Sequence, residues 1–279
     1  MFALDCPQRG HFMTDLYLSI SEQPEAVLDA IAASMDDRAK DPAMQEICAS
    51  YMGRLPGPGA RVLEIGCGNG ASTEALLQAT SPAHLTGVDP SEGLLVRARA
   101  RFHGRDGLRF ATGDAADTRQ SDAVFDLVVA HTVYSHLPDP AAALAEAFRV
   151  LKPGGTLAVF DGDYATNTVA LFDGDPLQAA MTATQRNLIH DCYIMRRLPA
   201  LMEDAGFHPP QCTAHGFVQT QRADYLRSLI SRGVNAAAKA AEIGQNLSEA
   251  FQTEATRRIT NGTFFGAILF ISAVATKPA

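Results

Sequence analysis

Short apolar segments alternate with amphipathic ones through the middle of the chain. The apolar segments predict strands at residues 61–65, 84–88, 108–112, 125–131 and 156–161. Between them, apolar residues recur at helical spacing and predict helices at residues 71–79, 91–102 and 140–150. A regular alternation of strands and helices is typical of βαβ units. We therefore expect a mainly parallel sheet with helices on both faces.

The segments on either side of this region have a different pattern. Helical spacing over residues 21–35 and 41–55 predicts an N-terminal helical cap, residues 1–58, which ends at the Pro56–Gly59 break. The remaining residues, 59–279, form the predicted main domain. After residue 161 we expect helix and loop over 166–191, a helix over 193–205, a strand at 211–219, helix over 222–259 and a final strand at 263–275.

Charge and hydropathy limit the kinds of partner that we expect the protein to bind. The formal charge is −8 and no basic run is present, which argues against a nucleic-acid backbone as the partner. The arginines at 97, 99, 101 and 105 lie along one predicted helix and its exit, and we interpret them as a solvated face. No apolar stretch is long enough to span a membrane, and the N-terminus lacks a signal-peptide pattern.

The five cysteines are scattered and contain no CxxC pair. This spacing indicates neither a zinc site nor a disulfide framework, so we expect no metal. A reducing, cytoplasmic location suits these cysteines best.

The segment at residues 62–70, VLEIGCGNG, is the first candidate for chemistry. A strand runs into a glycine-rich turn and then into a helix. Gly66 and Gly68 allow a tight turn, so that a ligand is able to lie against main-chain amides, and Gly70 lets the helix begin close to the strand. Taken alone, the segment is equally an ordinary tight turn.

Acidic residues follow the next two predicted strands. Asp89 ends the second strand, where a carboxylate is able to accept hydrogen bonds from both hydroxyls of a ribose. Asp114 follows the third strand, where a carboxylate beside a main-chain N–H is able to bind an adenine edge. Each acid alone is also a common helix cap or turn residue. Their order at successive strand ends favours one nucleoside site.

Taken together, the segments resemble class I S-adenosylmethionine-dependent methyltransferases, of the type that includes the ubiquinone and menaquinone methyltransferases. The matching segments, densest over residues 60–162, are VLEIGCGNG, LTGVDPSEGLL, ATGDAAD, FDLVVAHTVYSHLPDP and RVLKPGGTLAVFD. The resemblance implies a Rossmann-like, mainly parallel seven-stranded sheet with an antiparallel last strand. It also implies that Lys152–Gly155 is the turn before strand five. The sequence departs from this family between the last two strands, which are separated by a helical insertion at about 222–262. We interpret this insertion, together with one at about 163–195, as a lid, and the alternative is an oligomerisation or packing element.

The resemblance also implies roles for residues at the strand ends. Gly66, Cys67 and Gly68 would contact the methionyl part of S-adenosyl-L-methionine, with Glu64 supporting their loop. Asp89 and Pro90 would hold the ribose side of the adenosine, and Asp114 and Ala115 the adenine. His131 stands where the family uses a main-chain carbonyl for the cofactor amino group. Independently of the resemblance, Arg38 in the N-terminal cap is a candidate partner for the cofactor carboxylate, with a surface salt bridge as the alternative, and Tyr17 is a further candidate.

Candidates for assisting the reaction are fewer. A base is needed only where the acceptor carries a proton at neutral pH. His136, His190, Asp163 and Tyr164 are the candidate catalytic residues, the last two expected just after strand five. For His136 the alternative is a structural role, and for Asp163 it is a turn acid.

From these patterns we expect transfer of a methyl group from S-adenosylmethionine to a small-molecule acceptor at an O, N or C atom. A secondary metabolite or a quinone-like compound would suit. One alternative is a binding protein or catalyst of the same fold that does not methylate, and another is a protein methyltransferase. We expect a monomer or homodimer, with neither nucleic acid nor membrane as partner.

Overall fold

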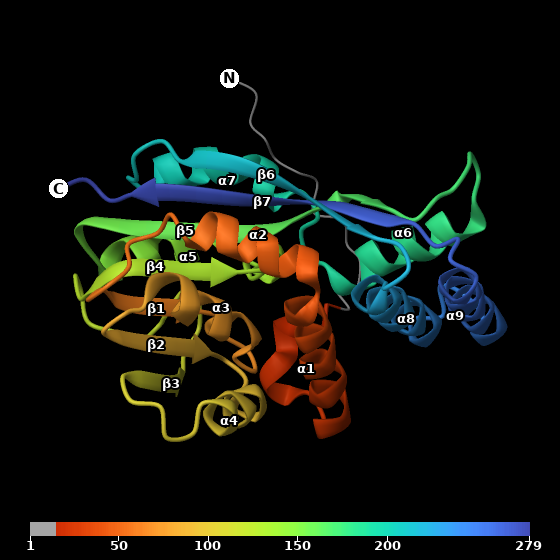
Figure 1. Cartoon of the computed structure of the whole chain (residues 1–279), viewed down its shortest axis with the longest axis horizontal. Helices are drawn as coiled ribbons and strands as arrows, with labels where there is room; N and C mark the ends of the chain where they lie inside the picture. Colours follow the sequence, from red (N-terminus) through yellow and green to blue (C-terminus); the bar gives the residue numbers. More distant parts are fainter. Residues whose placement is uncertain (1–14) are drawn as a thin grey trace.

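In the computed structural model, which describes residues 15–279, seven strands form one sheet in the order β3-β2-β1-β4-β5-β7-β6 (Figure 1). The bounds are β1 Arg61–Ile65, β2 His84–Asp89, β3 Leu108–Thr112, β4 Phe125–His131, β5 Leu151–Thr168, β6 Gln211–Gln219 and β7 Gly266–Thr276. Residues 1–14, with Cys6 and the start of the predicted cap, lie outside the described part of the chain.

Strands β1 to β5 run parallel, and β7 pairs antiparallel with both β5 and β6. This topology confirms the predicted Rossmann-like sheet with its antiparallel last strand. The carboxyl ends of β1, β2, β3 and β4 meet along one edge. In open sheets of this kind, ligands bind beyond that edge.

Two helical layers cover the sheet. Helices α2 (Pro42–Met52) and α3 (Ala71–Thr80) lie on one face, and α5 (Pro140–Val150) and α7 (Ile194–Asp204) lie on the other (Figure 1). The strand residues alternate between the two cores, since Val62 packs with the first layer while Leu63 and Ile65 pack with the second. This alternation with period two is what buries both faces of the sheet.

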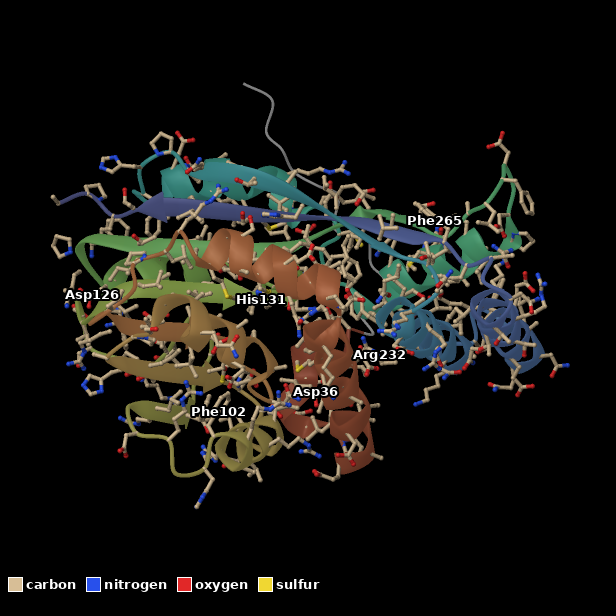
Figure 2. All side chains as sticks on the ribbon, viewed as in Figure 1. Asp36, Phe102, Asp126, His131, Arg232 and Phe265 are labelled. Atoms are coloured by element: carbon tan, nitrogen blue, oxygen red, sulfur yellow. The ribbon has the colours of Figure 1, made fainter. Side chains whose placement is uncertain are left out.

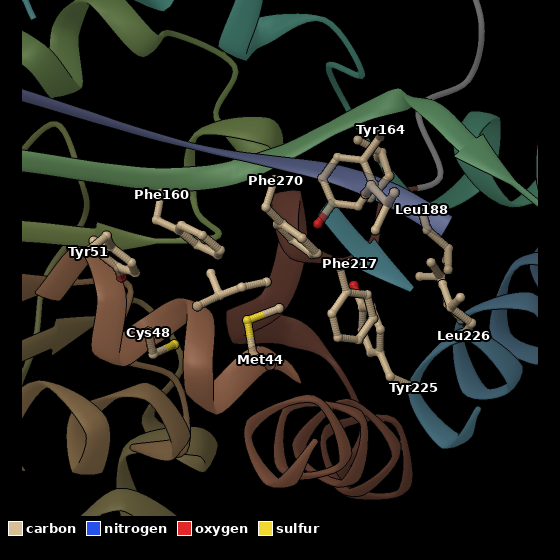
Figure 3. Packing of buried hydrophobic residues seen from close by; sticks show 14 of the residues in the cluster. Met44, Cys48, Tyr51, Phe160, Tyr164, Leu188, Phe217, Tyr225, Leu226 and Phe270 are labelled. Atoms are coloured by element: carbon tan, nitrogen blue, oxygen red, sulfur yellow. The ribbon is translucent and has the colours of Figure 1, made fainter. Parts of the chain in front are cut away.

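An aromatic column crosses the first core from α2 toward the helical insertion (Figure 3). Tyr51 stacks on Phe160 at 4.8 Å between ring centroids, and Phe160 stacks on Phe270 at 5.1 Å. Phe217 meets Phe270 edge-on at 5.7 Å and Tyr225 at 6.0 Å. The column therefore connects the sheet to the helix that carries Tyr225.

Strand β5 is longer than predicted at both ends, and the predicted turn at residues 152–155 is inside it. Leu151 pairs with Phe125 of β4, and the pairing between β4 and β5 shifts register between Phe125 and Leu127. At the other end, β7 pairs with β5 as far as Asp163 and again at Thr168. Asp163 and Tyr164 thus lie within β5 rather than after it. The local pattern could not predict this, because the partner strand is about a hundred residues away in the sequence.

The predicted insertion between the last two strands is present, but it consists of two helices rather than one. Helices α8 (Asp224–Lys239) and α9 (Gln245–Thr260) are separated by residues 240–244, and both lie beside α6 (Pro176–Leu188) (Figure 1). Gly233 allows the close contact, since a Cβ there would lie 2.2 Å from Thr184 Oγ1. A buried ion pair of Asp175 with Arg258, at 2.6 and 2.8 Å, joins the start of α6 to α9.

Helix α1 (Glu25–Lys40), which follows the short η1 turn (Leu16–Glu22), crosses the carboxyl edge of the sheet (Figure 1). Its acidic residues pair with helix α4 (Glu92–Arg101): Arg97 binds Glu25 and Asp29, and Arg101 binds Asp36. Two of the arginines interpreted as a solvated face therefore join α1 to α4. Among the residues described, no helix is long and apolar enough to cross a membrane.

Candidate active site

The glycine-rich turn after β1 folds back onto the end of β2. The main-chain N–H groups of Gly66 and Cys67 both donate to the Val88 carbonyl, at 2.8 and 3.1 Å. Gly66 and Gly68 have φ of +67° and +53°. A Cβ at Gly66 would lie 2.5 Å from the Val133 side chain, and one at Gly68 would lie 2.9 Å from the Met35 sulfur. Glycine is therefore required at both positions by conformation and by space.

Asp89 joins this turn to the end of β2. Its carboxylate accepts the N–H of Gly68 and the N–H of Ser91, each at 2.9 Å. Burial raises the pKa of Asp89 to about 6, although these two hydrogen bonds act in the opposite direction. The Asp89 carbonyl accepts the N–H of Gly113 at 3.2 Å, which brings the end of β3 beside it.

Glu64 supports the turn from behind. Its two carboxylate oxygens accept hydrogen bonds from the hydroxyls of Ser72 and Thr73, at 2.7 and 2.6 Å, in the first turn of α3. Burial raises the pKa of Glu64 to about 7, against the effect of the two hydroxyls. The Cys67 side chain lies in the core beside Gly87, so it does not face the carboxyl edge.

Asp114 stands one residue beyond Gly113 at the same edge. Its side chain is exposed and accepts the N–H of Ala116 at 2.8 Å, while Ala115 is buried. Pro90 follows Asp89 and is half-buried. The glycine turn, Asp89 at the end of β2 and the loop after β3 therefore lie next to one another.

The end of β4 has an unusual backbone. Thr132 has φ of +58°, which is rare for a β-branched residue, and its N–H donates to the Phe160 carbonyl at 2.6 Å. Arg38 of α1 donates to the Thr132 hydroxyl at 2.7 Å and helps to hold it. Such strain is frequent at functional sites. The neighbouring His131 ring is buried against Phe160 and hydrogen-bonded to the Tyr51 hydroxyl at 2.7 Å.

Burial and the charge of Arg38 hold the pKa of His131 well below its usual range. A neutral, buried ring that is already bonded to Tyr51 is poorly placed to exchange protons. The carbonyl of His131 accepts the Thr132 hydroxyl at 2.7 Å. Its main chain rather than its ring thus belongs to the carboxyl edge.

A pocket opens beside the end of β4. It lies between α1, the η1 turn, β5 and the helical insertion. Its lining residues are Tyr17, Ser34, Met35, Arg38, Thr132, His136, Tyr164, Leu188, Ile189, Tyr225, Leu229 and Arg232. The pocket combines an apolar wall with a few polar groups, which is the usual character of a small-molecule site.

His136 is held in a fixed orientation at this pocket. Its Nδ1 lies 2.8 Å from an Asp15 carboxylate oxygen, and its ring lies against Tyr17 at 4.2 Å between centroids. A histidine that donates from Nδ1 to a carboxylate keeps Nε2 free as an acceptor. Within residues 15–279, Nε2 of His136 has no hydrogen-bond partner.

The pocket thus brings together four predicted residues: Tyr17, Arg38, His136 and Tyr164. The other two predicted catalytic residues do not line it. The main-chain N–H of His190 donates to Asp15 at 2.9 Å, and the ring Nδ1 is buried with no partner among residues 15–279.

Asp163 points elsewhere, toward Arg196 of α7. Its carboxylate accepts the Nε of this arginine at 2.8 Å.

Several residues of this pocket were not predicted from the sequence. Tyr225, Leu229 and Arg232 are spaced at i, i+4 and i+7, which places them on one face of α8. That spacing was a usable signal, although it did not show what the face contacts. Asp15 gave no signal, because its partner His136 is 121 residues away.

A second and larger hollow lies between α2 and α3 and reaches His131. Met44, Cys48 and Ala75 contribute much of its apolar wall. It runs along α3 and shares Met35 and Arg38 with the first pocket.

Comparison with known proteins agrees with this arrangement. Residues 63–159 match the family described as a methyltransferase domain. A trans-aconitate 2-methyltransferase of Methylobacterium radiotolerans is 34% identical over 180 residues, which are 63% of this chain and 66% of that protein. A demethylmenaquinone methyltransferase of Clavibacter sepedonicus is 38% identical over 104 residues, 37% of this chain and 42% of that protein.

The fold also matches solved structures. The [4+2]-cyclase SpnF superposes with a TM-score of 0.59 at 17% identity, over 93% of this chain and 97% of that one. The chain spans about half the length of the first curated relatives that it matches.

Fold, glycine turn and strand-end acids together define a class. The chain carries a class I S-adenosylmethionine-dependent methyltransferase domain, as the sequence indicated. S-adenosylmethionine is the cofactor of this family.

Proposed function

We propose that the protein transfers a methyl group from S-adenosylmethionine to a small molecule bound in the pocket beside β4. The observation that carries the proposal is the hydrogen bond of 2.9 Å between the glycine turn and Asp89, with Asp114 following the adjacent strand end. A turn without Cβ atoms and two neighbouring carboxylates suit an adenosyl group. The donor set fits the cofactor of the family.

We assign the binding roles as follows. The main chain of Gly66–Gly68 and the guanidinium of Arg38 hold the methionyl part, with Tyr17 beside Arg38 at the same pocket. Asp89 accepts the ribose hydroxyls, Asp114 and Ala115 contact the adenine, and the His131 carbonyl accepts the amino group. When bound, S-adenosylmethionine supplies an electrophilic methyl group on a sulfonium. Positioning is the main task left to the protein.

His136 is the proposed base for an acceptor that carries a proton. Asp15 orients the ring and stabilises the imidazolium that forms when Nε2 takes the proton. Tyr164 orients the acceptor from β5, and the main chain of His190 helps to hold Asp15. Asp163 holds Arg196 and thereby the packing of α7 against β5.

The trans-aconitate and demethylmenaquinone methyltransferases among the relatives support a small-molecule acceptor. The [4+2]-cyclase of the same fold keeps a second function open, in which the cofactor binds and no methyl group is transferred.

One experiment separates these two functions. The protein is incubated with S-adenosylmethionine labelled in the methyl group and a library of small acids, phenols and amines, while calorimetry measures cofactor binding. We expect binding and a labelled product. Binding without any labelled product would favour the second function, and absence of binding would overturn both.

His136→Gln tests the role of the base on the labelled product. It should lower the rate about 10²- to 10⁴-fold for a hydroxyl acceptor and leave cofactor affinity unchanged. His208→Gln, outside the pocket, is the matched control. Equal rates for the two variants would remove His136 from the mechanism.

A further inference from the structure

Two half-buried guanidinium groups line one pocket without an acidic partner. Arg38 and Arg232 both border the pocket beside β4, and neither forms an ion pair within residues 15–279. No Asp or Glu is among the residues that line this pocket. By contrast, Arg196 and Arg258 each bind a buried carboxylate. The uncompensated positive charge is therefore concentrated where a ligand would bind.

Arg38 already has a role in the proposed function. It reaches from α1 to the Thr132 hydroxyl at the end of β4, beside the His131 carbonyl. That position suits the carboxylate of the cofactor, and one guanidinium is sufficient for one carboxylate. Arg232 is then left without an anionic partner among residues 15–279.

Arg232 reaches the pocket from α8, inside the helical insertion (Figure 2). Its Nη2 donates to the Ser34 hydroxyl at 3.1 Å, while its Nε is buried and has no acceptor among the described residues. Burying an N–H group without a hydrogen-bond acceptor is unfavourable in free energy, and it is more unfavourable when the group is charged. An anionic ligand would remove this cost.

The surroundings of Arg232 select a type of anion. Leu188, Ile189 and Leu229 form an apolar wall, so the remainder of the ligand is apolar in part. Burial raises the pKa of the nearby Tyr17, and the positive charges of Arg232 and Arg38 act in the opposite direction. One fork of N–H donors and one hydroxyl match the two oxygens of a carboxylate better than the three of a phosphate.

We propose that the methyl acceptor is an organic carboxylate whose anionic group is held by Arg232. This inference rests on the proposed function, since it names the acceptor class for the same pocket. It also gives the insertion between the last two strands a purpose, because α8 supplies the residue that recognises the acceptor's charge.

Binding in the presence of S-adenosylhomocysteine tests the proposal without requiring turnover. The probes are three carboxylates, each with a neutral counterpart: 4-hydroxybenzoate and its amide, 3-phenylpropanoate and its amide, and trans-aconitate and its trimethyl ester. Phenyl phosphate is added as the competing anion. We expect at least one carboxylate to bind about 10- to 100-fold more tightly than its neutral counterpart and than phenyl phosphate.

Variants then locate the effect. Arg232→Gln should remove the preference for the carboxylate and leave the affinity for S-adenosylhomocysteine unchanged. Arg232→Lys keeps a charge but loses the fork, so an intermediate preference is expected, and it provides a second folded variant. Arg227→Gln, on the exposed side of the same helix, is the matched control and should behave as the original protein.

Four results would overturn the proposal: no preference for any carboxylate, tighter binding of phenyl phosphate, an unchanged preference in Arg232→Gln, or weaker S-adenosylhomocysteine binding in that variant. The last would assign Arg232 to the cofactor. Failure of the original protein to bind S-adenosylhomocysteine would instead refute the proposed function, so the two failures are distinguishable.

Discussion

Asp89 should make cofactor affinity depend on pH in a defined window. Burial raises its pKa to about 6, and only the ionised carboxylate accepts hydrogen bonds at both oxygens. As the pH falls below that value, an increasing fraction of the free protein carries a protonated Asp89. S-adenosylhomocysteine affinity should then fall about tenfold for each pH unit, or about 1.4 kcal/mol. At pH well above 6, affinity should be constant.

Glu64 titrates close to the same window, with a pKa raised to about 7, so a variant is needed to assign the effect. Asp89→Asn removes the ionisable group and turns an amide N–H₂ toward the N–H of Gly68 or Ser91. We expect its affinity to be weaker by about 1.5–3 kcal/mol at high pH and to lose the step near pH 6.

Isothermal titration calorimetry measures the S-adenosylhomocysteine affinity of the original protein and of Asp89→Asn. The titrations run from about pH 5 to about pH 8, a range with the pKa of Asp89 near its middle. Asp126→Asn is the matched control, since that carboxylate also accepts a main-chain N–H but lies at the opposite edge of the sheet (Figure 2). A pH-independent affinity in the original protein, or the same step near pH 6 in Asp89→Asn, would refute the reasoning.

Three further predictions concern stability. Above pH 7, Glu64→Gln should be more stable than the original protein by up to about 3 kcal/mol. The pKa of Glu64 is about 7 in the folded protein against an ordinary value of 4.5, so the original protein loses stability as the pH rises from 4.5 to 7. Urea unfolding at low and high pH measures this, and an equal difference at both would contradict it. Gly66→Ala should lower the free energy of unfolding by about 1–3 kcal/mol, because position 66 has a positive φ and a Cβ there would contact Val133. Adding Val133→Ala should recover only the part of the loss that is due to this contact. Full recovery in the double variant would show that the positive φ causes no strain. Arg258→Leu should destabilise the protein by about 3–5 kcal/mol, because it leaves the carboxylate of Asp175 buried and without its ion-pair partner. Limited proteolysis of this variant should begin in α9. An unchanged thermal unfolding temperature would contradict this prediction.

The parallel part of the sheet was predictable because its signals are local. Each strand from β1 to β4 has an apolar segment of its own, and each of the first three strands is followed by a residue with a recognisable task. Gly66, Asp89 and Asp114 are close in space because parallel strands end at one edge. Their position at one edge follows from the order of the elements.

The remainder depends on contacts between distant residues. The extension of β5 past Asp161 requires β7, and the orientation of His136 requires Asp15. The arginines on α4 looked like a solvated face because the acids of α1 that bind them lie about seventy residues earlier. Arg232 gave a helical spacing but no indication that its helix turns back over the sheet edge.

A crystal structure with S-adenosylhomocysteine tests the central claim most directly. We expect the ribose hydroxyls on the Asp89 carboxylate, the adenine beside Asp114 and Ala115, and the homocysteine part along Gly66–Gly68. A nucleoside bound instead in the hollow between α2 and α3, out of reach of Asp89, would contradict the account.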